Sequence, residues 1–307
     1  MTFPSIATNP SSVFSRHSPE DPLRALQRTG ILSTDDLFSR EELHTLQSVL
    51  DPLFERKNDE ARSYVHPDEL LDAGLWPLVF SEKMRSLLFY LMPDPVLYHC
   101  HVYEIAGGNP EPHIFAESLA GWHCDVARQC DTDGPTHISL FVYLTDVGPD
   151  SGAFEFVPYA ARHWLRSGAP VISVFGKAGY TFVWNREFFH RAAPNLSTIR
   201  RRLLKISVQR NRYPSAHLTN KHFQRVSRGI APGDIAMDIL LGRFQGGNAP
   251  RLPSPTSPPT WHHIPSNARL HLPTWRMLIV QLRRRLAIFK SKLSGLGRVP
   301  DKAIARD

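Results

Sequence analysis

Cysteine is scarce in this chain of 307 residues, which contains only Cys100, Cys124 and Cys130. An odd number without framework spacing does not favour a disulfide scaffold. A zinc site built on Cys124 and Cys130 is also disfavoured, because no Cys-x-x-Cys pair or second cluster accompanies them. The cysteine content therefore favours a protein of a reducing compartment.

Long hydrophobic runs are missing as well. No apolar stretch approaches the roughly 20 residues that a membrane-spanning helix needs. Residues 1–21 are rich in Ser and Pro and lack the apolar segment of a secretory signal. We therefore expect a cytoplasmic protein whose residues 1–21 are disordered.

Acidic residues are nearly absent from the end of the chain. Residues 269–307 contain ten Lys and Arg but only two Asp, whereas the whole chain carries a net charge of +7. The rest of the chain is therefore close to neutral. The high isoelectric point belongs to this basic end, and the body is not expected to bind nucleic acid.

Composition divides the chain after residue 21 into three parts. Residues 22–247 are long enough for one domain, residues 248–265 form a Pro/Ser-rich linker, and residues 266–307 form a basic tail. Within the tail, the apolar residues of 275–296 lie on one side of a predicted amphipathic helix. This helix is expected to dock on the protein's own core or a dimer mate, or to contact a partner protein or an anionic membrane surface.

A possible metal-binding motif lies near the middle of the chain, in Gly121-Trp122-His123-Cys124-Asp125. On a strand, His123 and Asp125 would point to the same side. With the later His190, they would supply two imidazole nitrogens and one carboxylate. Three such ligands on one side of a metal leave its other positions open, as in non-haem Fe(II) oxygenases.

A second His-x-Asp sequence, His66-Pro67-Asp68, has a different interpretation. It runs directly into Glu69-Leu70-Leu71, so that a proline and acidic residues occupy a predicted first helical turn. We interpret this copy as a helix start, not as a metal site.

The remaining patterns predict helices outside a β-rich body. Helices are expected over 22–30, from Ser39 onwards and over 76–92, with residues 31–33 as an edge strand. Residues 96–105 have strand composition, with His99, His101 and Tyr103 alternating on one face. That face points either into the body or outwards.

Several motifs in the same order resemble the phytanoyl-CoA dioxygenase (PhyH) family of Fe(II)/2-oxoglutarate oxygenases. They are Trp122-His123-Cys124-Asp125, Phe141-Val142-Tyr143-Leu144-Thr145-Asp146-Val147, Ser151-Gly152-Ala153-Phe154-Glu155-Phe156-Val157-Pro158, His190-Arg191-Ala192-Ala193-Pro194-Asn195, and Arg201, eleven residues after His190. The resemblance covers roughly residues 22–213. The chain departs from the family at Pro158-Tyr159-Ala160-Ala161-Arg162-His163, where Pro-Gly-Ser-His is usual, and at Cys124, where Gln is common.

The resemblance implies a mainly β fold with flanking helices, a double-stranded β-helix or jelly roll of the cupin kind. It implies a dioxygenase that uses Fe(II), 2-oxoglutarate and O₂, with His123, Asp125 and His190 as catalytic metal ligands. Because Asp125 is a carboxylate, and the family's halogenating relatives have a small residue there, hydroxylation is expected. The departures leave the substrate open among small metabolites, natural-product intermediates and acyl or lipid compounds.

The resemblance also suggests residues around the metal. Arg201 is expected to bind 2-oxoglutarate, because a guanidinium can grip a carboxylate through two parallel hydrogen bonds. Further co-substrate contacts are expected from Ser139, Tyr103 and His99. Candidates for binding an anionic group of the substrate are Arg128, Arg162 and Arg186. Two alternatives remain, a catalytically inactive jelly-roll binding protein and a cupin-type metalloenzyme that does not use 2-oxoglutarate.

Overall fold

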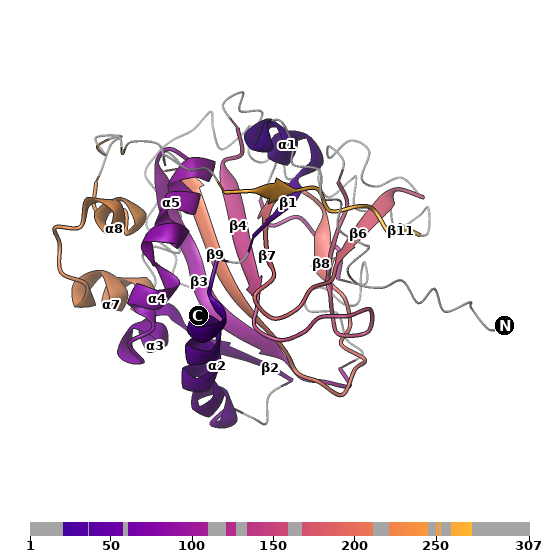
Figure 1. The fold of residues 1–307 in the computed structure, drawn as a ribbon, viewed down its shortest axis with the longest axis horizontal. Helices are drawn as coiled ribbons and strands as arrows, with labels where there is room; N and C mark the ends of the chain where they lie inside the picture. Colours follow the sequence, from indigo (N-terminus) through magenta and orange to yellow (C-terminus); the bar gives the residue numbers. More distant parts are fainter. Residues whose placement is uncertain are drawn as a thin grey trace, which may run out of the picture.

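The computed structural model consists mainly of two antiparallel β-sheets that face each other (Figure 1). It describes residues 21–35, 37–57, 61–109, 121–126, 134–158, 168–210, 221–244, 250, 252 and 259–271. The larger sheet has seven strands in the order β10-β1-β7-β4-β9-β3-β2, and the smaller has four in the order β11-β6-β5-β8. This arrangement confirms the predicted jelly-roll class.

The larger sheet is built from strands at both ends of the described chain. Its strands are β1 (Ile31–Thr34), β2 (Arg62–Val65), β3 (Pro95–Ile105), β4 (His137–Tyr143), β7 (Thr181–Asn185), β9 (Arg201–Arg210) and β10 (Trp261–His262). The strands of the smaller sheet are β5 (Phe154–Phe156), β6 (Pro170–Val174), β8 (His190–Ala192) and β11 (Ala268–Arg269).

Helices cover the outer face of the larger sheet (Figure 1). The helices of the described part are α1 (Pro22–Thr29), α2 (Arg40–Glu55), α3 (Pro67–Asp72), α4 (Trp76–Val79), α5 (Glu82–Leu91), α7 (Lys221–Gly229) and α8 (Ile235–Leu240). Helix α2 begins with a complete capping box, in which Ser39 accepts from the backbone N–H of Glu42 and the Glu42 carboxylate accepts from that of Ser39. None of these helices is long and apolar enough to cross a membrane.

Strand alternation produces two separate cores. In β4, Leu140 and Val142 pack under the helices, whereas Phe141 and Tyr143 face the smaller sheet. Because β4 is buried on both faces, every one of its residues is buried. The inner core lies between the sheets, where Phe154 of β5 joins the aromatic residues of β4 and β7.

Two sequence expectations differ from the structure at the edge of the larger sheet. Strand β1 is not an edge strand, because it pairs with β7 along one edge and with β10 along the other. Strand β10 lies in the segment 248–265, and its Trp261 is 1% exposed. This part of the predicted linker therefore belongs to the folded domain, and β11 extends the smaller sheet in the same way.

The predicted helical segment 76–92 is in fact two helices, α4 and α5. The break falls at Ser81, whose hydroxyl accepts from the backbone N–H of Met84 and caps α5. The second His-x-Asp copy is confirmed as a helix start, with His66 at the N-cap of α3. Its imidazole stacks on His222 of α7 at 4.1 Å between ring centroids, and its Asp68 bonds that same histidine.

Several sequence expectations lie outside the described residues. They concern the N-terminal segment 1–20, Arg128, Arg162 and the amphipathic segment 275–296.

Candidate metal centre

The two candidate histidine ligands are held together by backbone hydrogen bonds. His190 begins β8 of the smaller sheet, and His123 forms an isolated bridge with it. The backbone N–H of each donates to the carbonyl of the other, at 3.0 and 2.9 Å. Asp125 lies in a bend two residues after His123 and not on a strand, so strand alternation alone does not explain its direction.

Each imidazole ring is oriented by a backbone carbonyl two residues earlier in the chain. Nδ1 of His123 lies 2.7 Å from the carbonyl oxygen of Gly121, and Nδ1 of His190 lies 2.9 Å from that of Phe188. A carbonyl oxygen can only accept, so each Nδ1 carries a proton, and in the neutral ring the lone pair is then on Nε2. The His190 ring is further held by Trp184, at 4.1 Å between centroids.

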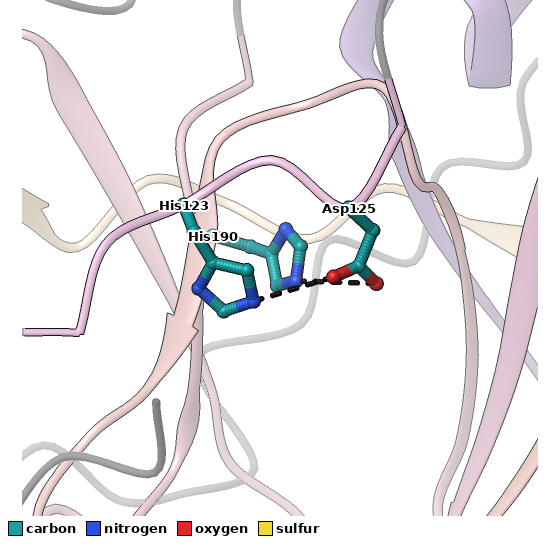
Figure 2. A group of neighbouring side chains, drawn as sticks. All are labelled: His123, Asp125 and His190. Carbon is teal, nitrogen blue, oxygen red and sulfur yellow. Dashed lines mark ion pairs between the residues drawn. The ribbon is translucent and has the colours of Figure 1, made fainter. Parts of the chain in front are cut away.

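The two Nε2 atoms point toward the carboxylate of Asp125 (Figure 2). His123 Nε2 lies 3.3 Å from Oδ1, and His190 Nε2 lies 3.7 Å from Oδ2. One ligand atom from each of the three residues lies within 4.8 Å of the others. Two imidazole lone pairs and a carboxylate converging on one point are a donor set that can hold a divalent metal.

The protonation states also suit metal binding. Burial lowers the pKa of His190 to about 3, although the negative charge of Asp125 acts in the opposite direction. Burial alone would raise the pKa of Asp125, but the electrostatic interaction with His190, a hydrogen bond with His123 and the Arg186 guanidinium together hold it well below its usual value. Metal ligands must be deprotonated, and these groups already are at neutral pH.

Arg186 fixes the orientation of Asp125. Its Nε and Nη2 both donate to Oδ2, at 3.0 and 2.7 Å, and its guanidinium lies 4.4 Å from the ring centroid of Tyr98. The side chain is buried, and Nη1 has no hydrogen-bond partner within the part of the chain that the structure describes. Two of the three guanidinium nitrogens of Arg186 are therefore used to hold Asp125. The predicted role of Arg186 in substrate binding stays a prediction, and only Nη1 is left to make such a contact.

Arg201 is buried on the inner face of β9, with 1% of its surface exposed. Its Nη2 donates to the hydroxyl of Tyr103 at 2.6 Å, and Nη1 donates to the carbonyl of Gly152. Its Nε has no hydrogen-bond partner among the residues that the structure describes. Its neighbours Arg200 and Arg202 bond Glu104 on the other side of the strand. Strand alternation therefore separates Arg201 from the arginines on either side of it.

The face of β3 with His99, His101 and Tyr103 points inward. Tyr103 belongs to the inner core, whereas Cys100 and Val102 belong to the core under the helices. The structure therefore brings Tyr103 to Arg201, while His99 lies further along the same face, 5.7 Å from His101 between centroids.

Ser139 is also on the inner face but already has a partner. Its hydroxyl lies 2.6 Å from that of Ser207 on β9, and both residues are fully buried. The expected contacts of Ser139 and His99 with a co-substrate stay predictions.

Sequence reasoning missed Lys205. It is four residues after Arg201, so strand alternation puts it on the same inner face. Burial and the charge of Arg186 lower its pKa to about 8, and the charge of Asp125 opposes this shift. The signal in the sequence was strand alternation, which places positions 201, 203 and 205 on the same face of the strand.

Comparison with known proteins agrees with this geometry. The model of the family described as phytanoyl-CoA dioxygenase (PhyH) matches residues 26–203, which is more than half of the chain. No curated protein matches the chain.

Solved structures share the fold at low sequence identity. AviO1 from Streptomyces viridochromogenes Tue57 is 19% identical with a TM-score of 0.52, and the match covers 63% of this chain and 95% of AviO1. EvdMO1 is 20% identical with a TM-score of 0.50 over 63% of this chain and 49% of EvdMO1. SnoK, a non-haem α-ketoglutarate-dependent carbocyclase from nogalamycin biosynthesis, is 17% identical with a TM-score of 0.50 over 63% of this chain and 84% of SnoK.

Proposed function

Because the chain belongs to the phytanoyl-CoA dioxygenase (PhyH) family, we propose that it is an Fe(II)/2-oxoglutarate-dependent dioxygenase that hydroxylates a C–H bond of a small organic substrate. The observation that carries this proposal is the convergence of His123, Asp125 and His190 on one point between the two sheets. Two imidazoles and one carboxylate match the facial triad of non-haem Fe(II) oxygenases.

The surroundings of Arg201 fit the second carboxylate of 2-oxoglutarate. A buried guanidinium normally pairs with a carboxylate or phosphate. Here its described partners are the neutral Tyr103 hydroxyl and Gly152 carbonyl, and Nε has none. A dicarboxylate would supply the missing negative charge and accept from Nε.

Bound iron and 2-oxoglutarate would supply O₂ activation, with 2-oxoglutarate converted to succinate and CO₂ as the substrate C–H bond is oxidised. The residues of the chain would position the metal ligands and exclude water from the site. The backbone carbonyls of Gly121 and Phe188 keep the two Nε2 lone pairs directed at one point. Trp184 and Phe154 pack against the His190 ring and keep bulk water from that side.

The substrate is proposed as a small metabolite, a natural-product intermediate or an acyl or lipid compound. SnoK, which shares the fold, is described as a carbocyclase from nogalamycin biosynthesis. An oxygenase of this fold can therefore have an outcome other than hydroxylation. The retained carboxylate of Asp125 supports hydroxylation here.

Anaerobic reconstitution tests the proposal. Protein mixed with Fe(II) and 2-oxoglutarate should show the weak visible charge-transfer band of the bidentate chelate. His123→Ala should abolish the band and Arg201→Ala should weaken it, whereas Arg225→Ala, a change in an exposed ion pair with Asp72, should leave it intact.

The same experiment separates the alternatives. Metal binding without the band would indicate a cupin-type metalloenzyme that does not use 2-oxoglutarate. A band without release of succinate when O₂ and candidate substrates are added would favour an inactive binding protein. Absence of both metal binding and the band in folded protein would overturn the proposal.

A further inference from the structure

Lys205 is a cation on the inner face of β9 without an ionic partner. It is half-buried, and within the described residues it makes no hydrogen bond or ion pair. Its Nζ lies 5.8 Å from the ring centroid of Phe141. Lysine is seldom buried without a partner, because desolvating the ammonium group costs free energy that only an opposite charge or good acceptors can offset.

A second cation lies in the same region. The Nε and Nη2 of Arg186 donate to Asp125, and its buried Nη1 has no hydrogen-bond partner among the described residues. Its charge and that of Asp125 both act on Lys205. Two cations thus share one carboxylate, and that carboxylate is also the candidate metal ligand.

Within the described part of the chain, the neighbours of Lys205 on the adjacent strands add no further negative charge. Across the sheet, Lys205 is opposite His101 on β3 and Phe141 on β4, and the next inward position of β9 is Ser207. Hydroxyl and imidazole groups can donate to an anion. The inner face next to Asp125 is therefore complementary to a negatively charged ligand.

Lys205 is too far from Arg201 to share one carboxylate with it. Four residues of strand separate them, which corresponds to about 13 Å along β9. Arg201 has its own surroundings, formed by Tyr103 and Gly152. The two cations of β9 therefore mark two distinct anion positions.

We propose that Lys205 and Nη1 of Arg186 bind a negatively charged oxyacid group of the substrate, a carboxylate or a phosphate ester, next to the His123, Asp125 and His190 cluster. This inference rests on the proposed function and narrows its substrate class to anionic compounds. Charge-assisted hydrogen bonds from an ammonium and a guanidinium would hold such a group and orient the neighbouring carbon atoms toward the metal.

Calorimetric titration with inorganic phosphate and with acetate tests the proposal. The wild type is compared with Lys205→Met, which keeps the length of the side chain, with Lys205→Arg, which keeps the charge, and with Lys177→Met as a control at an exposed ion pair. Each titration is done on the metal-free protein and again with Zn(II) and saturating 2-oxoglutarate.

We expect at least one of the two probes to bind the wild type and Lys177→Met equally. Lys205→Met should bind it at least about tenfold more weakly, the loss of one charge-assisted contact, and Lys205→Arg should recover most of the affinity. The affinity of Lys205→Met for 2-oxoglutarate should stay within about threefold of the wild type. Because an unpaired cation is removed, Lys205→Met should melt no lower than the wild type.

Three results would overturn the proposal. The first is that the wild type binds neither probe. The second is that Lys205→Met and the wild type bind the probes with equal affinity. The third is that Lys205→Met loses as much affinity for 2-oxoglutarate as it loses for the probe. The last would assign Lys205 to the co-substrate. The metal-free titrations need neither iron nor 2-oxoglutarate, so failure of the proposed function is recognised separately, by the missing charge-transfer band.

Discussion

At the scale of single residues, the cluster depends on groups that hold its ligands as much as on the ligands themselves. Arg186 directs two donors at Oδ2 of Asp125 and leaves Oδ1 beside the Nε2 of His123. The groups that orient metal ligands typically change metal affinity when they are removed. Arg186 is the residue through which this effect can be measured.

Replacement of Arg186 by Gln should weaken iron binding by about 10- to 100-fold. The carboxylate of Asp125 would lose its ion pair and rotate more freely, so the three ligand atoms would converge less well. Fe(II) affinity can be measured anaerobically by competition with a chromogenic chelator, with Arg225→Gln as control. Unchanged affinity in Arg186→Gln would show that the backbone alone positions Asp125.

Replacement of Arg201 by Gln should raise the Kd for 2-oxoglutarate by about 100-fold, because a charge-assisted pair with a carboxylate is lost. Tyr103→Phe should raise it by only about tenfold, since one neutral hydrogen bond to the guanidinium disappears. Both are measured by titrating the charge-transfer band. Equal, small effects of the two changes would argue that another cation binds the co-substrate.

His137 makes the stability of the metal-free protein depend on pH. Burial, with the charge of Arg186, lowers its pKa to about 4, although a hydrogen bond with Gln209 acts the other way. Unfolding restores an ordinary pKa of about 6.5. Above that value neither state binds the proton, but between pH 6.5 and 4 the unfolded state binds more, so stability is lost as the pH falls.

The loss attributable to His137 should reach about 3 kcal/mol near pH 4. Urea unfolding at pH 7, 6, 5 and 4 measures it, and His137→Gln should show a shallower dependence than His44→Gln, a change at an exposed helix position. His190, whose pKa is lowered to about 3, and carboxyl groups with lowered pKa values such as Asp125 contribute to the remaining slope. Identical slopes in the two variants would contradict the assignment.

The sequence predicts the three ligands and Arg201 because their identity and spacing are properties of the chain itself. It does not predict the partner of Arg186, because 61 positions separate this residue from Asp125 and only the bend after His123 brings the two together. The position of Lys205 on the inner face could have been predicted from strand alternation alone. Its significance depends on the nearby charges of Arg186 and Asp125, which only the three-dimensional arrangement reveals.

At the scale of elements, the longer strands and capped helices follow their sequence patterns, and the shortest elements do not. Helix α2 begins where Ser39 and Glu42 predict a capping box. Strands β10 and β11 have only two residues each, too few for a periodic pattern, and they follow a Pro-rich segment. Their position is decided by β1 and β6, which offer free edges far away in the sequence.

Strand β10 should be essential for stability. Trp261 is almost completely buried and stacks near Tyr90 of α5, at 6.1 Å between centroids. Trp261→Ala should lower the free energy of unfolding by about 3 to 5 kcal/mol, because a large cavity would remain. Chemical unfolding checks this, with Leu196→Ala, a change at a side chain that is 60% exposed, as the control. A loss below about 1 kcal/mol would mean that β10 only rests on the surface.

At the scale of the whole molecule, positive charge is concentrated at one end of the chain. Residues 272–307 lie outside the described residues, and their role follows from sequence alone. The apolar side of the predicted helix 275–296 needs a surface to cover it. Docking on the protein's own body is the commoner fate of such a helix, and the alternative is an anionic membrane surface, which would also attract its basic residues.

Docking on the body predicts two results for a chain that ends at residue 271, which keeps β10 and β11. It should unfold at a lower temperature than the full chain, because apolar surface becomes exposed, and it should match the full chain in flotation with vesicles containing phosphatidylserine. Flotation of the full chain alone, lost at high salt, would instead assign the helix to a membrane surface. In that case the two chains should also melt alike in the absence of vesicles, because the body would never have been covered by the helix.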